Sequence, residues 1–153
     1  MTQEVIALAS DHAGLALKTA LTEELTALGF AVLDLGTEST ASVDYPDYGY
    51  RMAAALADGK AARGVLVCGS GIGISMAANR YSWVRAALCH DVTSARLCRE
   101  HNDANVIAFG ERLIGIEVAK EALRMFLNTP FAGDRHVRRV TKLGTPPDKP
   151  SVA

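Results

Sequence analysis

The sequence predicts an α/β fold, a doubly wound sheet of five parallel strands with helices on both faces. Two observations carry this prediction. Five short runs of β-branched or aliphatic residues recur, and most are nearly continuously apolar, as parallel strands covered on both faces are. Helical patterns separate the runs, and right-handed crossovers between parallel strands place helices on both faces of the sheet.

The expected strands are residues 5–9, 31–35, 64–68, 84–89 and 105–109. Leucines at helical spacing fill residues 17–28 after the first strand, and Gly29 ends that helix. Pro46 suits the first turn of a second helix, which ends near residue 58. A short helix over 73–79 follows the third strand, Asp91 is the expected N-cap of a helix reaching residue 100, and residues 118–126 form an amphipathic helix.

Composition indicates one ordinary globular domain. The chain has 153 residues, and its 16 Lys and Arg against 17 Asp and Glu give a formal net charge of −1. We expect a single domain over residues 1–143 and a frayed, Pro-rich tail over 144–153. Near neutrality argues against a nucleic-acid or membrane-surface partner, since such proteins usually carry a basic excess.

The three cysteines are Cys68, Cys89 and Cys98, an odd number without CxxC spacing, so we expect neither a disulfide framework nor a cysteine zinc site. The N-terminal stretch lacks the pattern of a signal peptide, and no apolar run approaches the length of about 20 residues that a membrane span needs. We therefore expect a soluble, cytoplasmic protein.

Reactive side chains follow the expected strands, at the edge of a parallel sheet where ligands bind. Asp11 and His12 follow the first strand, Cys68 ends the third, and Arg112 follows the fifth. His101 and Asn102 end the fourth helix, and we place them on the same ligand-binding edge. Such clusters are typical of acid–base chemistry, although each histidine alone could be a structural, hydrogen-bonded residue.

The turn after the third strand carries glycines at 69, 71 and 73, an arrangement that lets backbone N–H groups approach a phosphate or an oxyanion. It departs from the dinucleotide fingerprint because Ile74 stands where that motif has its last glycine, and no P-loop lysine follows. The alternative is a tight turn that binds no ligand.

Cys68 directly precedes this turn, where the positive end of the next helix favours a thiolate. It could act as a covalent nucleophile or as a proton-transfer base, whereas Cys89 and Cys98 are expected to be buried and inert. Arg135 and Arg139 share a helix face and could clamp a phosphate, although such arginines are often simply solvated. No HExxH or CxxC spacing is present, so no metal is expected.

Together these residues resemble the ribose-5-phosphate isomerase type B family, whose members also include galactose-6-phosphate, allose-6-phosphate and tetrulose-phosphate isomerases. The resemblance covers residues 4 to about 143. It rests on SDHAG at 10–14, DYP at 44–46, CGSGIGIS at 68–75, AANR at 77–80, REHND at 99–103, AFGER at 108–112, and Arg135, His136 and Arg139. It implies a Rossmann-like sheet, an aldose–ketose isomerase with neither metal nor other cofactor, and a homodimer or homotetramer with active sites at the dimer interface.

The resemblance also implies roles for individual residues. Cys68 would be the base that moves a proton between C2 and C1 through an enediolate, with Ser70 relaying hydroxyl protons. His101, helped by Asp11, would open the sugar ring. The backbone N–H groups of Gly69, Gly71, Gly73 and Ile74 would belong to the anion hole. Tyr45 and Asn102 would hold sugar hydroxyls, and His12, Arg112 and the other subunit's Arg135 and Arg139 would bind the phosphate.

One branch of the family replaces the cysteine with glycine and uses a glutamate on the next helix. Cys68 is present here and position 74 is Ile, so the chain resembles the cysteine branch. The expected reaction is the interconversion of D-ribose 5-phosphate and D-ribulose 5-phosphate, as in the pentose phosphate pathway. The alternatives are isomerisation of a tetrulose 4-phosphate, allose 6-phosphate or galactose 6-phosphate, a non-catalytic sugar-phosphate sensor, and a cysteine hydrolase.

Overall fold

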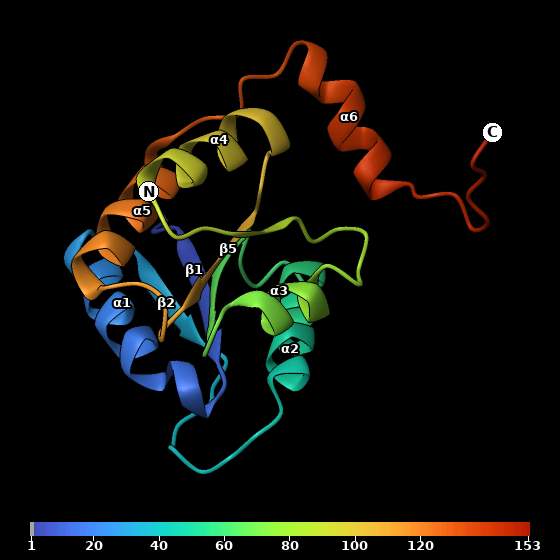
Figure 1. Cartoon of the computed structure of the whole chain (residues 1–153). Helices are drawn as coiled ribbons and strands as arrows, with labels where there is room; N and C mark the ends of the chain where they lie inside the picture. The colour runs from blue at the N-terminus through green and yellow to red at the C-terminus, as the bar shows by residue number, and fades with distance from the viewer. Residues whose placement is uncertain (1) are drawn as a thin grey trace.

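A computed structural model describes residues 2–153 as a parallel sheet between two layers of helices. The elements are β1 (Val5–Ser10), a 3₁₀ turn η1 (His12–Gly14), α1 (Leu15–Ala27), β2 (Ala31–Asp34), α2 (Tyr45–Ala57), β3 (Arg63–Cys68), α3 (Ile72–Ala78), β4 (Ala86–Leu88), α4 (Val92–Asn102), β5 (Val106–Gly110), α5 (Ile116–Asn128) and α6 (Arg135–Gly144). The strands are parallel in the order β2-β1-β3-β5-β4, as Figure 1 illustrates. The predicted α/β fold class is therefore confirmed.

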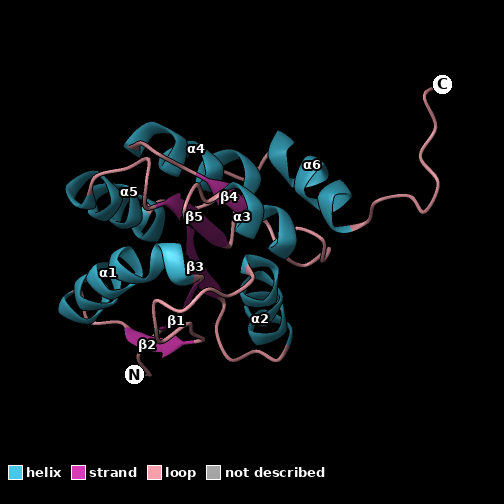
Figure 2. Cartoon of the chain, turned by 60° about the horizontal axis from the view of Figure 1, so that its bottom comes forward, coloured by secondary structure: helices cyan, strands magenta, loops and turns pink. Residues whose placement is uncertain are grey.

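Alternate residues of each central strand enter opposite cores. In β1, Ile6 and Leu8 pack with the helices α1, α4 and α5, whereas Ala7 and Ala9 pack with α2 and α3. Figure 2 shows these two helical layers on either side of the sheet. Leu21 and Leu25 of α1 are fully buried, and each such leucine contributes about 1.5–3 kcal/mol relative to an exposed position. Helices on both faces explain why the strands are continuously apolar.

The structure contains each predicted strand and helix, but some of these elements begin or end at other residues than predicted. β4 spans only Ala86–Leu88 instead of residues 84–89, because it is an edge strand that pairs with β5 alone. Asp91 caps α4 as predicted, accepting a hydrogen bond from the backbone N–H of Ser94 at 2.6 Å. The 3₁₀ turn η1 was not predicted, and Asp11 stabilises it by accepting hydrogen bonds from the N–H groups of Ala13 and Gly14.

Helix α6 stands apart from the body of the molecule and packs mainly against α4 (Figure 1). His136 is its one buried residue, whereas its arginines point to solvent. Residues 145–153 contain neither helix nor strand. Across residues 2–153, no helix combines the length and apolarity that crossing a bilayer would require.

Candidate active site

The carboxyl edge of the sheet holds an open pocket of about 360 Å³. Predicted site residues from four separate segments line it: Asp11, His12, Tyr45, Cys68, Gly69, Ser70, Gly73 and Arg112. They converge because parallel strands end at the same edge, so the residues that follow β1, β3 and β5 become neighbours. Tyr45 joins them from the first turn of α2.

Cys68 is the last residue of β3 and is only 4% exposed. Its Sγ atom accepts a hydrogen bond from the backbone N–H of Gly71 at 3.1 Å. A donor directed at the sulfur stabilises negative charge there, which suits a base or a nucleophile. Ser70 forms a similar local bond, because its Oγ atom accepts from the N–H of Ile72 at 3.2 Å. The N–H of Gly71, which was predicted to belong to the anion hole, and that of Ile72 therefore already have partners within the turn.

Each of the three glycines of the turn has close neighbours where a side chain would lie. Gly71 has φ +74°, and a Cβ atom there would lie 2.6 Å from the Leu88 side chain. A Cβ on Gly73 would lie 2.6 Å from the ring of Tyr45, and one on Gly69 would lie 3.3 Å from the guanidinium of Arg112. The absence of side chains thus lets Tyr45 and Arg112 lie against the turn. Ile74, by contrast, is fully buried and points into the core beneath it.

Hydrogen bonds hold the ring of His12 and the loop that carries Arg112. His12 Nδ1 accepts a hydrogen bond from the N–H of Val43 at 3.1 Å, which leaves Nε2 as the donor of the neutral ring. The loop around Arg112 is tied to the glycine turn, because the Arg112 N–H donates to the Gly69 carbonyl at 3.0 Å. Nothing in the local sequence signals the long-range contact between His12 and Val43. A neutral imidazole donor and a guanidinium in one pocket suit an anionic ligand.

Three further predicted residues, His101, Asn102 and Arg139, line a second pocket, of about 340 Å³. Its lining includes His101, Asn102, His136 and Arg139. The placement of His101 and Asn102 on the ligand-binding edge is wrong. The crossover helix α4 runs antiparallel to the strands, so its last turn lies beside the start of β5, at the amino edge. Along the six residues of β3 the two edges are roughly 17 Å apart, at about 3.3 Å per residue.

This arrangement separates groups that were expected to cooperate. Asp11 belongs to the pocket of Cys68 and His101 to the other, so a single chain does not pair them. Arg139 lines the pocket of His101, and Arg135 lies one turn earlier on the same helix. The predicted site residues of one chain are thus divided between two separate pockets at opposite edges of the sheet.

Sequence reasoning assigned no role to His136, which is only 6% exposed. Its ring stacks on that of His101, with centroids 4.5 Å apart and planes 16° from parallel. Burial lowers the pKa of His136 below its usual value, and the nearby Arg135, His101 and Arg139 add to this effect. Helical spacing could have indicated this, because it puts His136 about 80° around the helix from the face shared by Arg135 and Arg139.

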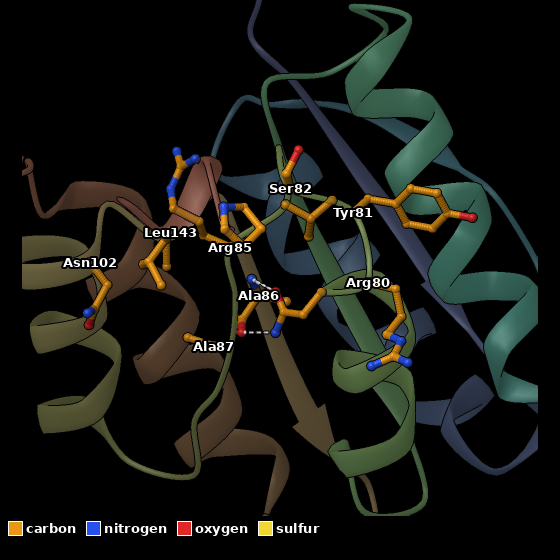
Figure 3. A pocket seen from close by; sticks show the side chains of 12 residues that line it. Arg80, Tyr81, Ser82, Arg85, Ala86, Ala87, Asn102 and Leu143 are labelled. Atoms are coloured by element: carbon orange, nitrogen blue, oxygen red, sulfur yellow. Dashed lines mark hydrogen bonds between the residues drawn. The ribbon is translucent and has the colours of Figure 1, made fainter. Parts of the chain in front are cut away.

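A third pocket, of about 500 Å³, lies between α6, the edge strand β4 and the end of α3. Figure 3 shows Asn102 and Leu143 on one side of it and Arg80 and Tyr81 on the other. Asn79 and Ala86 both line this pocket, and the side chain of Asn79 forms hydrogen bonds with both backbone polar groups of Ala86. Apart from Asn102, no predicted site residue lines this pocket.

The other two cysteines lie in the core between β4 and α4 and are both buried, as expected. A hydrogen bond with Cys89, reinforced by burial, raises the pKa of the Cys98 thiol above its ordinary value. Cys98 is therefore held in the neutral thiol form, unlike a cysteine poised for chemistry.

Comparison with known proteins matches residues 6–143 to a family described as "Ribose/Galactose Isomerase". The chain belongs to this ribose/galactose isomerase family. The resemblance to ribose-5-phosphate isomerase type B is thereby confirmed, and the protein is a sugar-phosphate isomerase of the aldose–ketose type.

Relatives of this isomerase are similar over nearly their whole length. Ribose-5-phosphate isomerase B of Escherichia coli is 44% identical over 135 residues, which cover 88% of this chain and 91% of that protein. D-erythrulose-4-phosphate isomerase of Pectobacterium atrosepticum is 42% identical over 140 residues, covering 91% and 92%.

Solved structures of the family have the same fold. A ribose 5-phosphate isomerase from Thermotoga maritima superposes with a TM-score of 0.91 at 46% identity, covering 94% of this isomerase and 99% of that chain. Ribose-5-phosphate isomerase B of Clostridium thermocellum gives a TM-score of 0.90 at 44% identity, covering 92% and 95%.

Proposed function

We propose that this isomerase interconverts D-ribose 5-phosphate and D-ribulose 5-phosphate with Cys68 as the base. The observation that carries the proposal is the hydrogen bond from Gly71 N–H to Cys68 Sγ, inside a pocket that also holds His12 and Arg112. The thiolate takes the proton from C2 of the open-chain aldose, and the resulting enediolate receives it back at C1. C2 is thereby oxidised and C1 reduced, with no metal or other cofactor taking part.

The neighbouring groups supply the other functions that this reaction needs. Ser70 relays protons between the sugar hydroxyls, and remaining N–H groups of the glycine turn stabilise the enediolate oxygen. Tyr45, which lies against Gly73, holds a sugar hydroxyl. His12 and Arg112 bind the phosphate, whose two charges suit a neutral donor beside a guanidinium.

The complete site needs a second copy of the chain. His101, which opens the sugar ring with Asp11, lies at the opposite edge of the sheet from Cys68. A two-fold dimer brings the amino-edge pocket of one protomer, with its Asn102, Arg135 and Arg139, against the carboxyl-edge pocket of its partner. Exposed apolar side chains border the Cys68 turn and suit such an interface; they are Ile72, Met76 and Leu88.

A four-carbon substrate is the second candidate. It is favoured by the 42% identity to the D-erythrulose-4-phosphate isomerase of Pectobacterium atrosepticum, which is close to the identity with the Escherichia coli enzyme. The family description also names galactose, so six-carbon phosphates belong in the same comparison.

The test is a panel of four-, five- and six-carbon aldose phosphates assayed with one preparation, including allose 6-phosphate and galactose 6-phosphate. We expect the highest kcat/KM with ribose 5-phosphate, and exchange of the C2 hydrogen with solvent during turnover. Efficient turnover of another sugar with none of ribose 5-phosphate would reject the proposed substrate. A covalent adduct trapped on Cys68 without C2 exchange would favour the cysteine hydrolase, and binding without any turnover would favour the sensor.

Mixing inactive variants tests the shared site. Cys68→Ala and His101→Ala damage different half-sites, so a heterodimer of the two contains one intact site. Co-refolded chains should recover about a quarter of wild-type activity, because half of the dimers formed are heterodimers and each has one working site of two. No recovery in a mixture shown to contain heterodimers would contradict the shared site.

A further inference from the structure

His136 and His101 form a stacked imidazole pair that joins two helices. The ring centroids are 4.5 Å apart and the planes 16° from parallel. His101 lies in the last turn of α4, and His136 lies in the first turn of α6. Both rings line the amino-edge pocket together with Asn102 and Arg139.

The stacked pair also lies where α6 packs against the rest of the molecule. His136 is the one buried residue of that helix, and α4 is the main element against which α6 packs. In Figures 1 and 2, α6 stands outside the body of the molecule beside α4. Arg135 and Arg139 flank His136 on α6. The position of His136 against α4 therefore sets the direction of these two guanidinium groups.

The surroundings of His136 keep its ring neutral. Arg135, Arg139 and His101 are cationic or become so on protonation, and Asp134 is the one acidic group that acts on His136 in the other direction. Burial of the ring works with the cations to lower its pKa. A neutral flat ring can lie face to face on His101 without the repulsion that two imidazolium rings would suffer.

We propose that His136 is a positioning residue of the isomerase, which sets the ring plane of His101 and the pointing direction of Arg139 through the imidazole stack. The proposal rests on the proposed function, in which His101 opens the sugar ring and Arg139 binds the phosphate. His136 itself does not touch the substrate; its contribution is the placement of two groups that do.

Three variants separate stacking from imidazole chemistry. His136→Phe keeps a flat ring that can stack but cannot titrate or donate a hydrogen bond, whereas His136→Ala removes the ring. Val137→Ala is the matched control, since Val137 is the next residue of α6 and is exposed. Where the alanine variant does not fold, His136→Leu replaces it, because leucine fills the space without a flat face.

We expect the phenylalanine variant to keep kcat and KM within about threefold of wild type. The alanine or leucine variant should lose kcat by roughly 10- to 100-fold, as misplaced catalytic groups do, and should raise KM because the phosphate arginines move. Wild-type kinetics in the alanine or leucine variant would overturn the proposal. Equal loss in the phenylalanine and alanine variants, both folded, would also overturn it, since it would make the imidazole itself necessary.

A spectroscopic readout keeps this test independent of the substrate. The stacked ring shifts the ring-proton NMR signals of His101, and this shift should persist in His136→Phe and disappear in His136→Ala or His136→Leu. An unchanged His101 signal in the ring-less variant would overturn the stack itself. If wild type turned over another sugar phosphate and none of ribose 5-phosphate, the substrate proposal would fail while the same variants, assayed on that sugar, would still test His136.

Discussion

The sulfur of Cys68 accepts a hydrogen bond from the backbone N–H of Gly71, three residues further along the chain, at 3.1 Å. Gly71 itself adopts φ +74°, a conformation that glycine reaches without the strain of a side chain. A side chain at position 71 would also strike Leu88 and the backbone of Phe109. Glycine is thus required for the shape of the turn in which the backbone N–H of residue 71 reaches the thiol.

Replacing Cys68 by alanine should abolish turnover and leave phosphate binding intact. A positioned general base contributes about 100- to 10,000-fold to the rate, so kcat should fall by at least about 100-fold. The matched control is Cys98→Ala, which removes an equally buried thiol from the other core. Steady-state kinetics and calorimetric titration with sugar phosphate measure the two effects. Similar losses of kcat in both variants would argue against a special role for Cys68.

Gly71→Ala should destabilise the protein by at least about 2 kcal/mol, because a left-handed alanine is strained and its Cβ has no room. Gly115→Ala is the control, since Gly115 has φ −76° and nothing within 4 Å of an added Cβ. Urea unfolding monitored by circular dichroism gives both free energies of unfolding. Equal stability of the two variants would contradict the close packing of the turn.

Acid should loosen α6 before it unfolds the sheet. The folded-state pKa of His136 lies below its ordinary value of 6.5, because the ring is buried and Arg135, His101 and Arg139 lie near it. Protonation therefore favours states in which the ring is exposed. The stabilisation is fully present above pH 6.5 and is lost as the pH falls below it toward the folded-state pKa.

Amide hydrogen exchange of α6, corrected for the intrinsic rate, measures this effect on both sides of pH 6.5. Protection should fall on the acid side in the wild type. The His136→Phe variant, whose ring does not titrate, should lose this dependence. Equal protection of wild-type α6 at both pH values would mean that His136 does not anchor the helix.

Lys18→Met should lower the free energy of unfolding by about 1–3 kcal/mol, since it removes the donor of a buried hydrogen bond. The Lys18 ammonium is nearly inaccessible and lies 2.6 Å from Asp34 Oδ1 and 2.7 Å from the Thr37 carbonyl. The comparison variant is Lys120→Met, whose more exposed ammonium lies 4.0 Å from Glu24 and should cost less than about 1 kcal/mol. Thermal and urea unfolding give the loss of free energy of unfolding in each variant. Equal losses in the two variants would contradict the effect of burial on the Lys18 ion pair.

Local rules explain which parts of the fold were predictable. The run from Gly64 to Cys68 is apolar because β3 is covered on both faces, and Asp91 caps α4 through a bond to a residue three positions away. The ends of β4 were less predictable because an edge strand is limited by its single neighbour, β5. The hydrogen bond between His12 and Val43 joins residues 31 positions apart, so no local pattern reports it.

The sequence by itself determined the strand–helix alternation and the group of residues that directly follow strands, Cys68 and Arg112 among them. Strand direction is common to the whole parallel sheet, so residues after successive strands must meet at one edge. Only the tertiary structure decided that His101 lies at the other edge and stacks on His136. The physical reason is that the crossover helix α4 runs antiparallel to the strands, so its last turn lies at the opposite edge. The position at which α6 packs against α4 depends on contacts between segments that are distant in the sequence.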